Sequence, residues 1–356
     1  MRKLKNIIVT GGSGFIGSNF IHHIFERGNF DGRIINVDNL TYAGNPENLK
    51  DIDEIYGGEK YFFEKADICN FDKINDICKR YDIDTIVHFA AESHVDRSIY
   101  GPKDFIETNI VGTFTLLEIV RSLWEGRDDV LFHHVSTDEV YGSLGERGYF
   151  YEDTPYDPHS PYSASKASSD HMVKAYSHTY GLPVTISNCT NNYGPYQFPE
   201  KLIPLMILNI MEGKPLPIYG DGKNIRDWLY VDDHNSAVWM IMNKGIIGET
   251  YNIGGENEWE NIRLVNVISE KMAAYLGKHR DEYKNLIEFV KDRPGHDRRY
   301  AINCDKIKGE LQWCQGVDFD EGLNKTIEWY LKNEDWVNNI RSGNYKKWIE
   351  KNYEKR

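Results

Sequence analysis

The chain has 356 residues, of which 40% are hydrophobic, and a formal net charge of −13 at pH 7. This length exceeds what one compact core usually serves, so we expect one large domain and a smaller one. The acidic balance argues against a nucleic-acid partner, because a phosphate backbone requires a basic surface.

Five scattered cysteines form no CxxC motif and no metal-type spacing with histidine, which is typical of a reducing compartment. The apolar run Ile7–Val9 is too short for the core of a signal peptide. No window approaches the ~20 apolar residues needed to cross a bilayer. We therefore expect a soluble, cytoplasmic protein with no metal and no membrane partner. Four histidines are expected to be structural: His22, His23, His133 and His134.

Short apolar runs alternate with stretches of helical periodicity through the first half of the chain. The runs predict strands over Asn6–Thr10, Arg33–Val37, Lys60–Phe63, Thr85–Phe89, Val130–Ser136 and Pro183–Ser187. The stretches between them predict helices over Gly14–Arg27, Phe71–Arg80, Pro102–Trp124 and Pro161–Tyr180. This alternation predicts an α/β fold, a Rossmann-type doubly wound parallel sheet covered by helices on both faces.

Near Asn188 the alternation gives way to a stretch rich in Asn, Pro, Gly and Tyr. Two further runs, Trp228–Val231 and Thr250–Ile253, are predicted to return to the sheet. The large domain is therefore expected to span residues 1–187 and 228–255. A smaller, discontinuous α/β domain is expected to span residues 188–227 and 256–356.

A glycine turn follows the first predicted strand. Residues 7–17 read IIVTGGSGFIG, in which Gly11, Gly14 and Gly17 form the pattern GxxGxxG. Glycine permits a tight turn and lets N–H groups at a helix N-terminus approach a pyrophosphate. The strand before the turn and the helix after it favour a dinucleotide site over a turn without a ligand.

An acidic residue follows the second predicted strand. At that place Asp38 can accept hydrogen bonds from the hydroxyls of an adenosine ribose. Its charge would repel a 2′-phosphate, so the sequence favours NAD over NADP. Asp67, after the third strand, is a further candidate for the adenine end, although by itself it is a common loop carboxylate.

Ser160 and Pro161 are typical of a helix N-terminus, and Tyr162 and Lys166 follow on one face of that helix. A free phenol has a pKa near ~10. The lysine ammonium and a positively charged nicotinamide both favour the phenolate, so the tyrosine can act as a base near neutral pH. A surface Tyr-x-x-x-Lys pair is common, but one that lies downstream of a glycine turn indicates a redox site.

The glycine turn, the segment His134–Thr137 and the Tyr162–Lys166 pair together resemble the extended short-chain dehydrogenases/reductases. The resemblance implies NAD and a catalytic group of Thr137, Tyr162 and Lys166, in which Thr137 bonds the reacting sugar hydroxyl. It implies a cofactor site that also includes Gly11, Gly14, Phe15, Ile16, Gly17, Asp38, Asn39, Thr41, Asp67, Ile68 and Ala90.

Two carboxyl side chains, Asp138 and Glu139, directly follow Thr137. An epimerase does not need them, because it only removes and returns one hydride. A dehydratase needs an acid and a base, which one protonated and one ionised carboxyl group supply. Neighbours on a regular strand point to opposite faces, so both can act only if the chain leaves the strand at Asp138. The alternative is that they cap the following turn.

Further segments between Ile7 and Asp297 resemble the dTDP-glucose 4,6-dehydratases. Besides Thr137–Glu139 they are Val37–Asn45, Ala90–Ser98, Asn191–Pro195, Phe198–Pro204, Gly220–Trp228 and Arg293–Asp297. By this resemblance Asp138 is the acid and Glu139 the base. GDP-mannose dehydratases carry a serine in place of Asp138, which argues against them. Many family members have lysine in place of Asn39, and this difference affects cofactor affinity.

The same resemblance implies a nucleotide-diphosphate site in the second domain. Arg226 and Arg293 can bind a diphosphate bidentately, and Tyr219 offers an aromatic face to a pyrimidine. Ser93 and Asn109 are candidates for hydrogen bonds near the sugar or the nicotinamide. The expected substrate-binding residues are Ser93, Asn191, Lys201, Leu202, Pro217, Tyr219, Arg226, Asn261, Arg293 and His296.

We therefore expect a carbon–oxygen lyase of deoxysugar biosynthesis. With tightly bound NAD it would oxidise C4 of dTDP-glucose, eliminate water across C5 and C6, and return the hydride to C6, which gives dTDP-4-keto-6-deoxyglucose. The alternatives are a UDP-glucose 4,6-dehydratase or a nucleotide-sugar 4-epimerase on the same scaffold, or an NAD-binding protein without catalysis. The resemblance also implies a homodimer, with a four-helix interface built from Pro102–Trp124 and Pro161–Tyr180.

Overall fold

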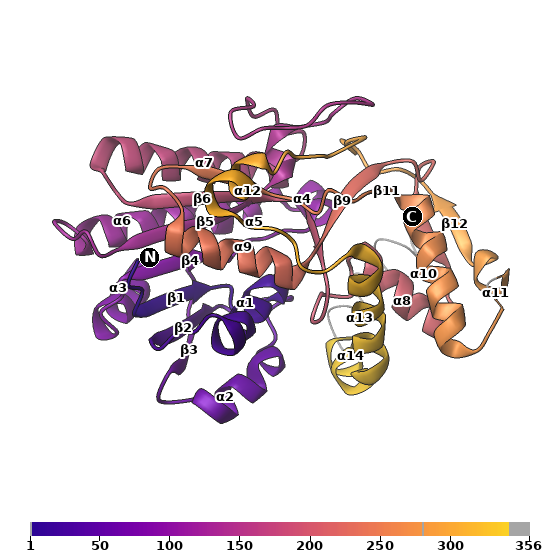
Figure 1. Ribbon diagram of the computed structural model, residues 1–356, viewed down its shortest axis with the longest axis horizontal. Coiled ribbons are helices and arrows are strands. Elements are labelled where there is room, and N and C mark those ends of the chain that lie inside the picture. Colours follow the sequence, from indigo (N-terminus) through magenta and orange to yellow (C-terminus); the bar gives the residue numbers. More distant parts are fainter. Residues whose placement is uncertain (1, 280, 342–356) are drawn as a thin grey trace.

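The computed structural model describes residues 2–279 and 281–341 of the chain. Its larger part holds a seven-stranded sheet in the order β10-β6-β5-β4-β1-β2-β3, and every neighbouring pair is parallel (Figure 1). The six strands predicted in the first half of the chain are all present. The bounds are β1 Asn6–Thr10, β2 Arg33–Asp38, β3 Tyr61–Lys65, β4 Thr85–His88, β5 Leu131–Thr137, β6 Val184–Cys189 and β10 Thr250–Ile253.

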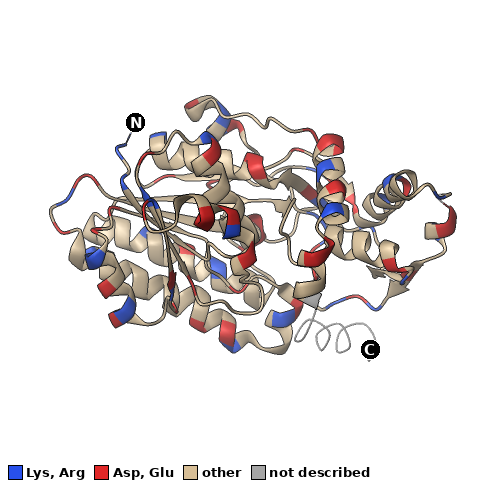
Figure 2. Ribbon diagram, turned by 90° about the horizontal axis from the view of Figure 1, so that it is seen from below, with Lys and Arg blue, Asp and Glu red and all other residues tan. Residues whose placement is uncertain are grey.

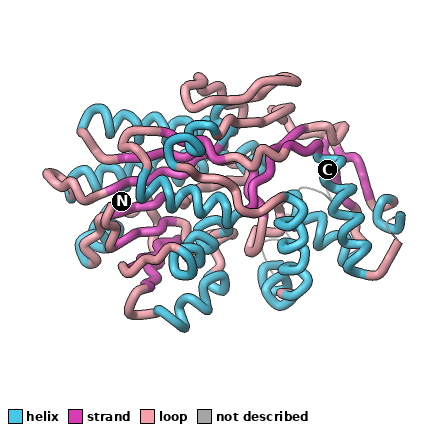
Figure 3. Tube along the Cα trace, viewed as in Figure 1, coloured by secondary structure: helices cyan, strands magenta, loops and turns pink. Residues whose placement is uncertain are grey.

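Helices cover both faces of this sheet (Figure 3). One face packs its apolar side chains against α1 (Phe15–Arg27), α2 (Lys50–Tyr56), α9 (Val231–Lys244) and α12 (Asp305–Leu311). The other packs against α3 (Phe71–Arg80), α6 (Thr113–Leu123) and α7 (Pro161–Tyr180). Ile7 belongs to the first core and Ile8 to the second, because neighbouring strand residues point to opposite faces. β1, β4, β5, β6 and β10 are therefore buried along their whole length, as expected for a sheet covered on both sides, although β5 and β6 include polar residues.

The stretch predicted as one helix over Pro102–Trp124 contains a π-helical segment. It comprises α5 (Pro102–Phe105), the π-helix η2 (Ile106–Gly112) and α6. A π-helix frees a backbone carbonyl from the ordinary helical pattern, and such segments are common at functional sites. Here the carbonyl oxygen of Asn109 accepts hydrogen bonds from the hydroxyls of Ser169 and Thr113, each at 2.6 Å. This segment therefore joins α6 to α7 directly beside Lys166.

The smaller part of the molecule has two small sheets and its own apolar core, on the right of Figure 1. One sheet has the order β11-β9-β7, and the other pairs β12 with β8. Its strands are β7 Asn191–Tyr193, β8 Leu216–Tyr219, β9 Ile225–Tyr230, β11 Glu258–Glu260 and β12 Ile287–Val290. Its helices are α8 Leu202–Glu212, α10 Asn261–Leu276, α11 Asp281–Lys284, α13 Phe319–Lys332 and α14 Glu334–Arg341.

The prediction that Trp228–Val231 returns to the large sheet is wrong. Residues 225–230 form β9, which pairs with β7 and β11 instead, whereas Thr250–Ile253 does join β6 as predicted. The Asp227 carboxylate accepts the backbone N–H groups of residues 255–257, which holds the chain before β11 against β9. The predicted range 256–356 also includes residues 342–356, which lie outside the described residues.

The short elements η1 Pro46–Leu49, α4 Val95–Tyr100 and η3 Asp138–Tyr141 complete the fold of the described residues. Acidic and basic residues are interspersed over both parts (Figure 2). Across residues 2–279 and 281–341, every helix is too short or too polar to cross a membrane. The strand order reverses between β1 and β4, and crevices at such reversals bind ligands outside the carboxyl ends of the strands.

Candidate active site

A pocket opens at this reversal point, and the glycine turn forms one wall of it. Gly11, Gly14 and Gly17 line the pocket together with Phe15 and Ile16 at the start of α1. A Cβ at Gly11 would lie 2.7 Å from Ala90 Cα, and one at Gly17 would lie 2.3 Å from the Gly11 carbonyl oxygen. Side chains would therefore fill the cradle. The α1 N-terminus has no side-chain cap, so its N–H groups are available to a pyrophosphate.

Asp38 ends β2 at the same pocket and is buried. Its Oδ2 accepts the N–H of Ser13 at 3.0 Å and its Oδ1 accepts the N–H of Leu40 at 2.8 Å. Burial raises the pKa of this carboxyl group, and the two backbone hydrogen bonds oppose that rise. The remaining predicted cofactor residues line the pocket too: Asn39, Thr41, Asp67, Ile68 and Ala90. Asn39 donates to Asp67 at 3.1 Å. A cradle without side chains and a carboxylate beside it fit an adenine dinucleotide.

Tyr162 and Lys166 enter the pocket from the first turns of α7. Ser160 caps this helix, and its hydroxyl and that of Ser163 each accept the other residue's backbone N–H at 3.0 Å. Lys166 donates from Nζ to the carbonyl oxygen of Val135 at 2.9 Å. Both functional side chains are almost fully buried.

Burial raises the pKa of Tyr162 well above its usual value, and the charge of Glu139 adds to the rise. A hydrogen bond with Thr137 opposes it only in part. In the chain by itself Tyr162 is therefore a phenol, whereas the expectation of a phenolate rested on Lys166 and a nicotinamide together. Burial also lowers the pKa of Lys166. The positive charge of a nicotinamide is then the missing contribution that would favour the phenolate.

The chain leaves β5 at the place where two neighbouring carboxyl groups require it. Thr137 ends the strand and caps η3, and its Oγ1 accepts the N–H of Glu139 at 3.3 Å. Asp138 and Glu139 therefore lie on a tight helical turn rather than on a regular strand. Both line the same pocket as Thr137 and Tyr162.

The two carboxyl groups lie in different electrostatic environments. Burial raises the pKa of Asp138 well above its usual value, and the charge of Glu139 raises it further. Burial also raises the pKa of Glu139, but Arg293, Arg226 and Lys201 oppose that rise. Within the described residues no hydrogen bond reaches the buried Oδ2 of Asp138. Asp138 is thus suited to carry a proton and Glu139 to carry a charge.

Three cations of the smaller part surround Glu139. Lys201 donates from Nζ to the carbonyl oxygen of Ser93 at 3.0 Å. Arg226 donates to the carbonyl oxygen of Asp297 at 3.0 Å. Arg293 Nη1 lies 3.8 Å from Asp96 Oδ1. Ser93, Asn191 and Lys201 line the pocket.

The other predicted substrate residues lie beyond that lining. Tyr219 donates to Asp96 at 2.9 Å and meets the ring of His296 edge-on. Burial, and then the charge of Arg293, lowers the pKa of His296 to about 4. Asn261 begins α10, and among the described residues nothing bonds its buried Oδ1. Leu202 begins α8, and Pro217 pairs with Glu288 between β8 and β12.

Sequence reasoning missed several polar residues of the site. Glu200 lines the pocket and accepts hydrogen bonds from Tyr42 at 2.9 Å and from Arg97 at 3.2 Å. Its place next to Lys201, in a segment already noted, could have revealed it. Tyr300 donates to Asp297 at 2.5 Å, and burial together with Glu139 raises its pKa. No local pattern marks Tyr300, because only the fold brings it to Glu139.

The strand order and the Tyr162–Lys166 pair together define a Rossmann-type short-chain dehydrogenase/reductase. The family model described as GDP-mannose 4,6 dehydratase matches residues 8–326, and the chain belongs to this family.

Similar proteins of known name show which members of the family this chain resembles. The dTDP-glucose 4,6-dehydratase of Salmonella typhimurium is 54% identical over 98% of this chain and 99% of its own length. The enzyme of that name from Bacillus anthracis, crystallised with NAD, is 49% identical with a TM-score of 0.83 over 94% of this chain and 99% of that one. The Streptomyces venezuelae enzyme is 42% identical, with a TM-score of 0.86 over 94% of this chain and 99% of that one. The resemblance to the dTDP-glucose 4,6-dehydratases is thereby confirmed.

Proposed function

We propose that this chain catalyses the NAD-dependent dehydration of dTDP-glucose to dTDP-4-keto-6-deoxyglucose. The observation that carries the proposal is the pair Asp138 and Glu139, which lie on η3 beside Tyr162 in unlike electrostatic environments. An epimerase has no use for such a pair. The 54% identity to a dTDP-glucose 4,6-dehydratase, over 98% of this chain, supports the same reaction and the same nucleotide.

The cofactor, when bound, supplies the oxidation at C4 and the reduction at C6. Its site comprises the glycine turn and the pocket residues Phe15, Ile16, Asp38, Asn39, Thr41, Asp67, Ile68 and Ala90. Together with α12, which packs on the large sheet, residues 2–187 and 231–255 form the cofactor-binding domain. Its second segment starts with α9, because β9 pairs outside the large sheet.

Each catalytic side chain has one task. Tyr162 takes the proton of the C4 hydroxyl, and Thr137 bonds that hydroxyl. Lys166 stabilises the phenolate by its positive charge. Once C4 is a ketone the C5 proton is acidic, and Glu139 removes it while Asp138 protonates the departing C6 hydroxyl. When the hydride is returned to C6, Glu139 gives the proton back to C5. The products are one keto sugar and one water, so the cofactor is restored within each cycle and stays bound.

The nucleotide diphosphate binds among the cations of the smaller domain. Arg226 and Arg293 bind its phosphates, and Tyr219 contacts the base. Both arginines already act on Glu139 electrostatically, which supports a substrate that extends from these cations to the acid–base pair. Lys201, Asn191, Ser93, Leu202, Pro217, Asn261 and His296 complete this site.

The active form is a homodimer in which η2, α6 and α7 of two chains form the interface. Apolar side chains on this surface are exposed in the single chain, among them Ile106, Val111, Phe114 and Tyr180. Burial of such a surface is the usual driving force for a stable symmetric dimer.

The decisive experiment is incubation of the purified holoenzyme with dTDP-glucose labelled with deuterium at C4. We expect loss of one water and deuterium at C6 of the product. UDP-glucose, run in parallel, should turn over more slowly. Inversion at C4 without loss of water would identify an epimerase instead, and label in free NADH would contradict a cofactor that stays bound.

A further inference from the structure

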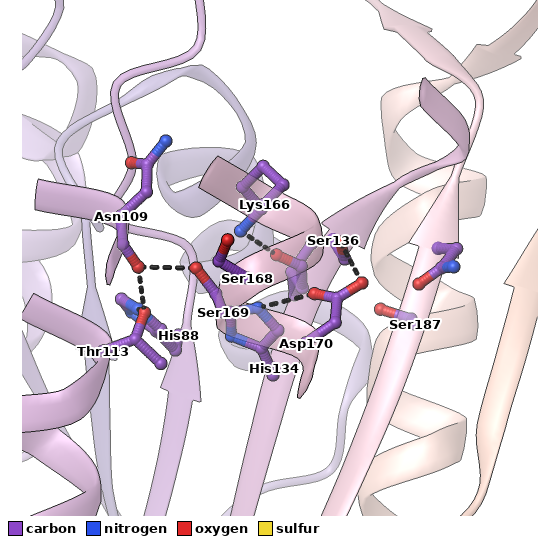
Figure 4. Close-up of polar contacts among 12 residues, drawn as sticks. His88, Asn109, Thr113, His134, Ser136, Lys166, Ser168, Ser169, Asp170 and Ser187 are labelled. Atoms are coloured by element: carbon purple, nitrogen blue, oxygen red, sulfur yellow. Dashed lines mark hydrogen bonds and ion pairs between the residues drawn. The ribbon is translucent and has the colours of Figure 1, made fainter. Parts of the chain in front are cut away.

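A buried carboxylate lies beneath the Tyr162–Lys166 pair, outside the chemistry described above. Asp170 is one helical turn beyond Lys166 on α7 and has no exposed surface. Its Oδ2 accepts hydrogen bonds from the hydroxyls of Ser136 at 2.8 Å and Tyr156 at 2.9 Å. Its Oδ1 lies 3.1 Å from His134 Nε2 (Figure 4). The Asp170 carboxylate thus connects α7 to β5 and to the loop before α7.

Two buried histidines face this layer from the neighbouring strands. Burial lowers the pKa of His134 on β5 to about 4, and the charge of Lys166 lowers it further against the opposing effect of Asp170. Burial lowers the pKa of His88 on β4 well below its usual value, with His134 and Lys166 adding to it. Both imidazoles are therefore neutral near pH 7, and neither balances the charge of Asp170.

Three further titratable groups of this region are neutral as well. Burial raises the pKa of Cys189 on β6 to about 12. It also raises the pKa values of Tyr156 and of Tyr141 on η3, and Asp170 adds to both. Glu139 and Asp138, also on η3, act on Tyr162. Lys166 is then the cation whose pKa the charge of Asp170 raises, while Lys174, further along α7, lies 5.5 Å from the centroid of the Tyr156 ring.

A buried ammonium needs a countercharge to stay protonated. Lys166 is 4% exposed, and Asp170 is the largest influence that opposes the effect of burial on its pKa. Both side chains also make hydrogen bonds from α7 to neighbouring residues of β5. Lys166 donates to the Val135 carbonyl oxygen, and Ser136 donates to Asp170. Thr137 follows directly on the strand.

We propose that Asp170 is a positioning residue whose charge keeps Lys166 protonated and whose hydrogen bond from Ser136 holds α7 against the end of β5. It acts on the reaction through Lys166 and Tyr162 and touches neither sugar nor cofactor. The inference rests on the proposed function, because a protonated Lys166 matters only where Tyr162 must lose a proton.

The test compares the pH dependence of cofactor reduction in wild type and in Asp170→Asn. Holoenzyme is mixed with dTDP-glucose in a single turnover, and absorbance near ~340 nm reports the reduced cofactor. Cofactor reduction requires a protonated Lys166, so its rate falls as the pH rises through the pKa of Lys166. Loss of a neighbouring opposite charge should move this alkaline limb to lower pH by about one to three units. One unit above the new limb, the rate falls about tenfold.

Tyr156→Phe is the matched control, because it removes one hydrogen bond to Asp170 and leaves the charge in place. Its alkaline limb should coincide with that of wild type even if its maximal rate changes. Asp170→Ser removes the charge with a smaller side chain and should shift the limb as Asp170→Asn does. It serves if the asparagine variant does not fold.

Unshifted limbs in the neutral variants overturn this inference, and so does an equal shift in Tyr156→Phe, which would indicate a purely geometric role. A wild-type enzyme that does not reduce its cofactor with dTDP-glucose overturns the proposed function instead. The two failures are therefore distinguishable.

Discussion

At the residue scale, burial and neighbouring charge separate the roles of adjacent carboxyl groups. Asp138 and Glu139 have the same chemistry in the sequence. Three cations, Arg293, Arg226 and Lys201, oppose the rise in the pKa of Glu139, whereas the cation that opposes the rise in the pKa of Asp138 is Arg226. For Asp138 the charge of Glu139 is the largest influence after burial, and it acts in the same direction. One group is thus an acid and the other a base before any substrate binds.

Substitution of the carboxyl groups should stall the reaction after oxidation. Asp138→Asn and Glu139→Gln leave Tyr162 and Lys166 in place, so C4 is still oxidised while elimination slows. We expect each variant to lower turnover by roughly 10²–10⁴-fold. Reduced cofactor should accumulate on the enzyme, measurable near ~340 nm in stopped flow.

Tyr162→Phe is the counterpart, because it removes the base that starts oxidation. Substrate should then produce no absorbance of reduced cofactor. Near-normal turnover in both carboxamide variants would mean that Asp138 and Glu139 merely cap η3, and the dehydratase assignment would fail.

At the element scale, the N-terminus of α7 carries the redox pair, so its cap should matter for stability and catalysis. Ser160→Ala removes the capping box and should destabilise the protein by about 0.5–2 kcal/mol. It should also slow cofactor reduction, because Tyr162 is in the first turn. Urea unfolding and single-turnover rates measure both effects. Ser168→Ala, which removes a hydrogen bond to the Ala164 carbonyl oxygen within the same helix, should change stability by less than about 0.5 kcal/mol. Equal losses in both variants would refute a special role of the cap.

The glycine turn offers a second test at this scale. An alanine Cβ at Gly17 would lie 2.3 Å from a backbone oxygen and 2.8 Å from Gly12 Cα, whereas one at Gly14 would lie 3.3 Å from its nearest neighbour. Gly17→Ala should therefore force the turn open at a cost of about 1–3 kcal/mol, and weaken NAD binding about tenfold or more. Gly14→Ala should have a much smaller effect. Titration of NAD into cofactor-stripped protein compares them, and equal affinities would contradict a tight cradle.

The strands were predictable from the sequence where apolar runs and helices alternate regularly along one sheet. The first six strands are short runs separated by helices of clear periodicity, so their order along the chain sufficed. β9 contains a similar run, but it also includes Arg226 and Asp227, and it has an antiparallel and a parallel neighbour in a separate sheet. Apolar runs do not state which sheet they join, and here the bonds of Asp227 decide it.

At the scale of the whole molecule, the proposed dimer has a direct test. Phe114 is 43% exposed on α6, and Ile55 is 68% exposed on α2, away from the proposed interface. Light scattering at micromolar concentration should find wild type and Ile55→Glu as dimers and Phe114→Glu as a monomer, because a buried charge without a partner is costly. A monomeric wild type would refute the interface.

The sequence by itself determined the Rossmann-type class, and it predicted the cofactor cradle and the five residues to which we assign the proposed chemistry. It could do so because the glycine turn and the Tyr162–Lys166 pair are local patterns whose spacing follows from the geometry of one turn or one helix. Only the tertiary structure decided that three cations oppose the rise in the pKa of Glu139 while Glu139 itself raises that of Asp138, that β9 leaves the large sheet, and that Asp170 lies beneath Lys166 against β5. Those outcomes depend on burial and on charges from distant segments, which no local spacing encodes.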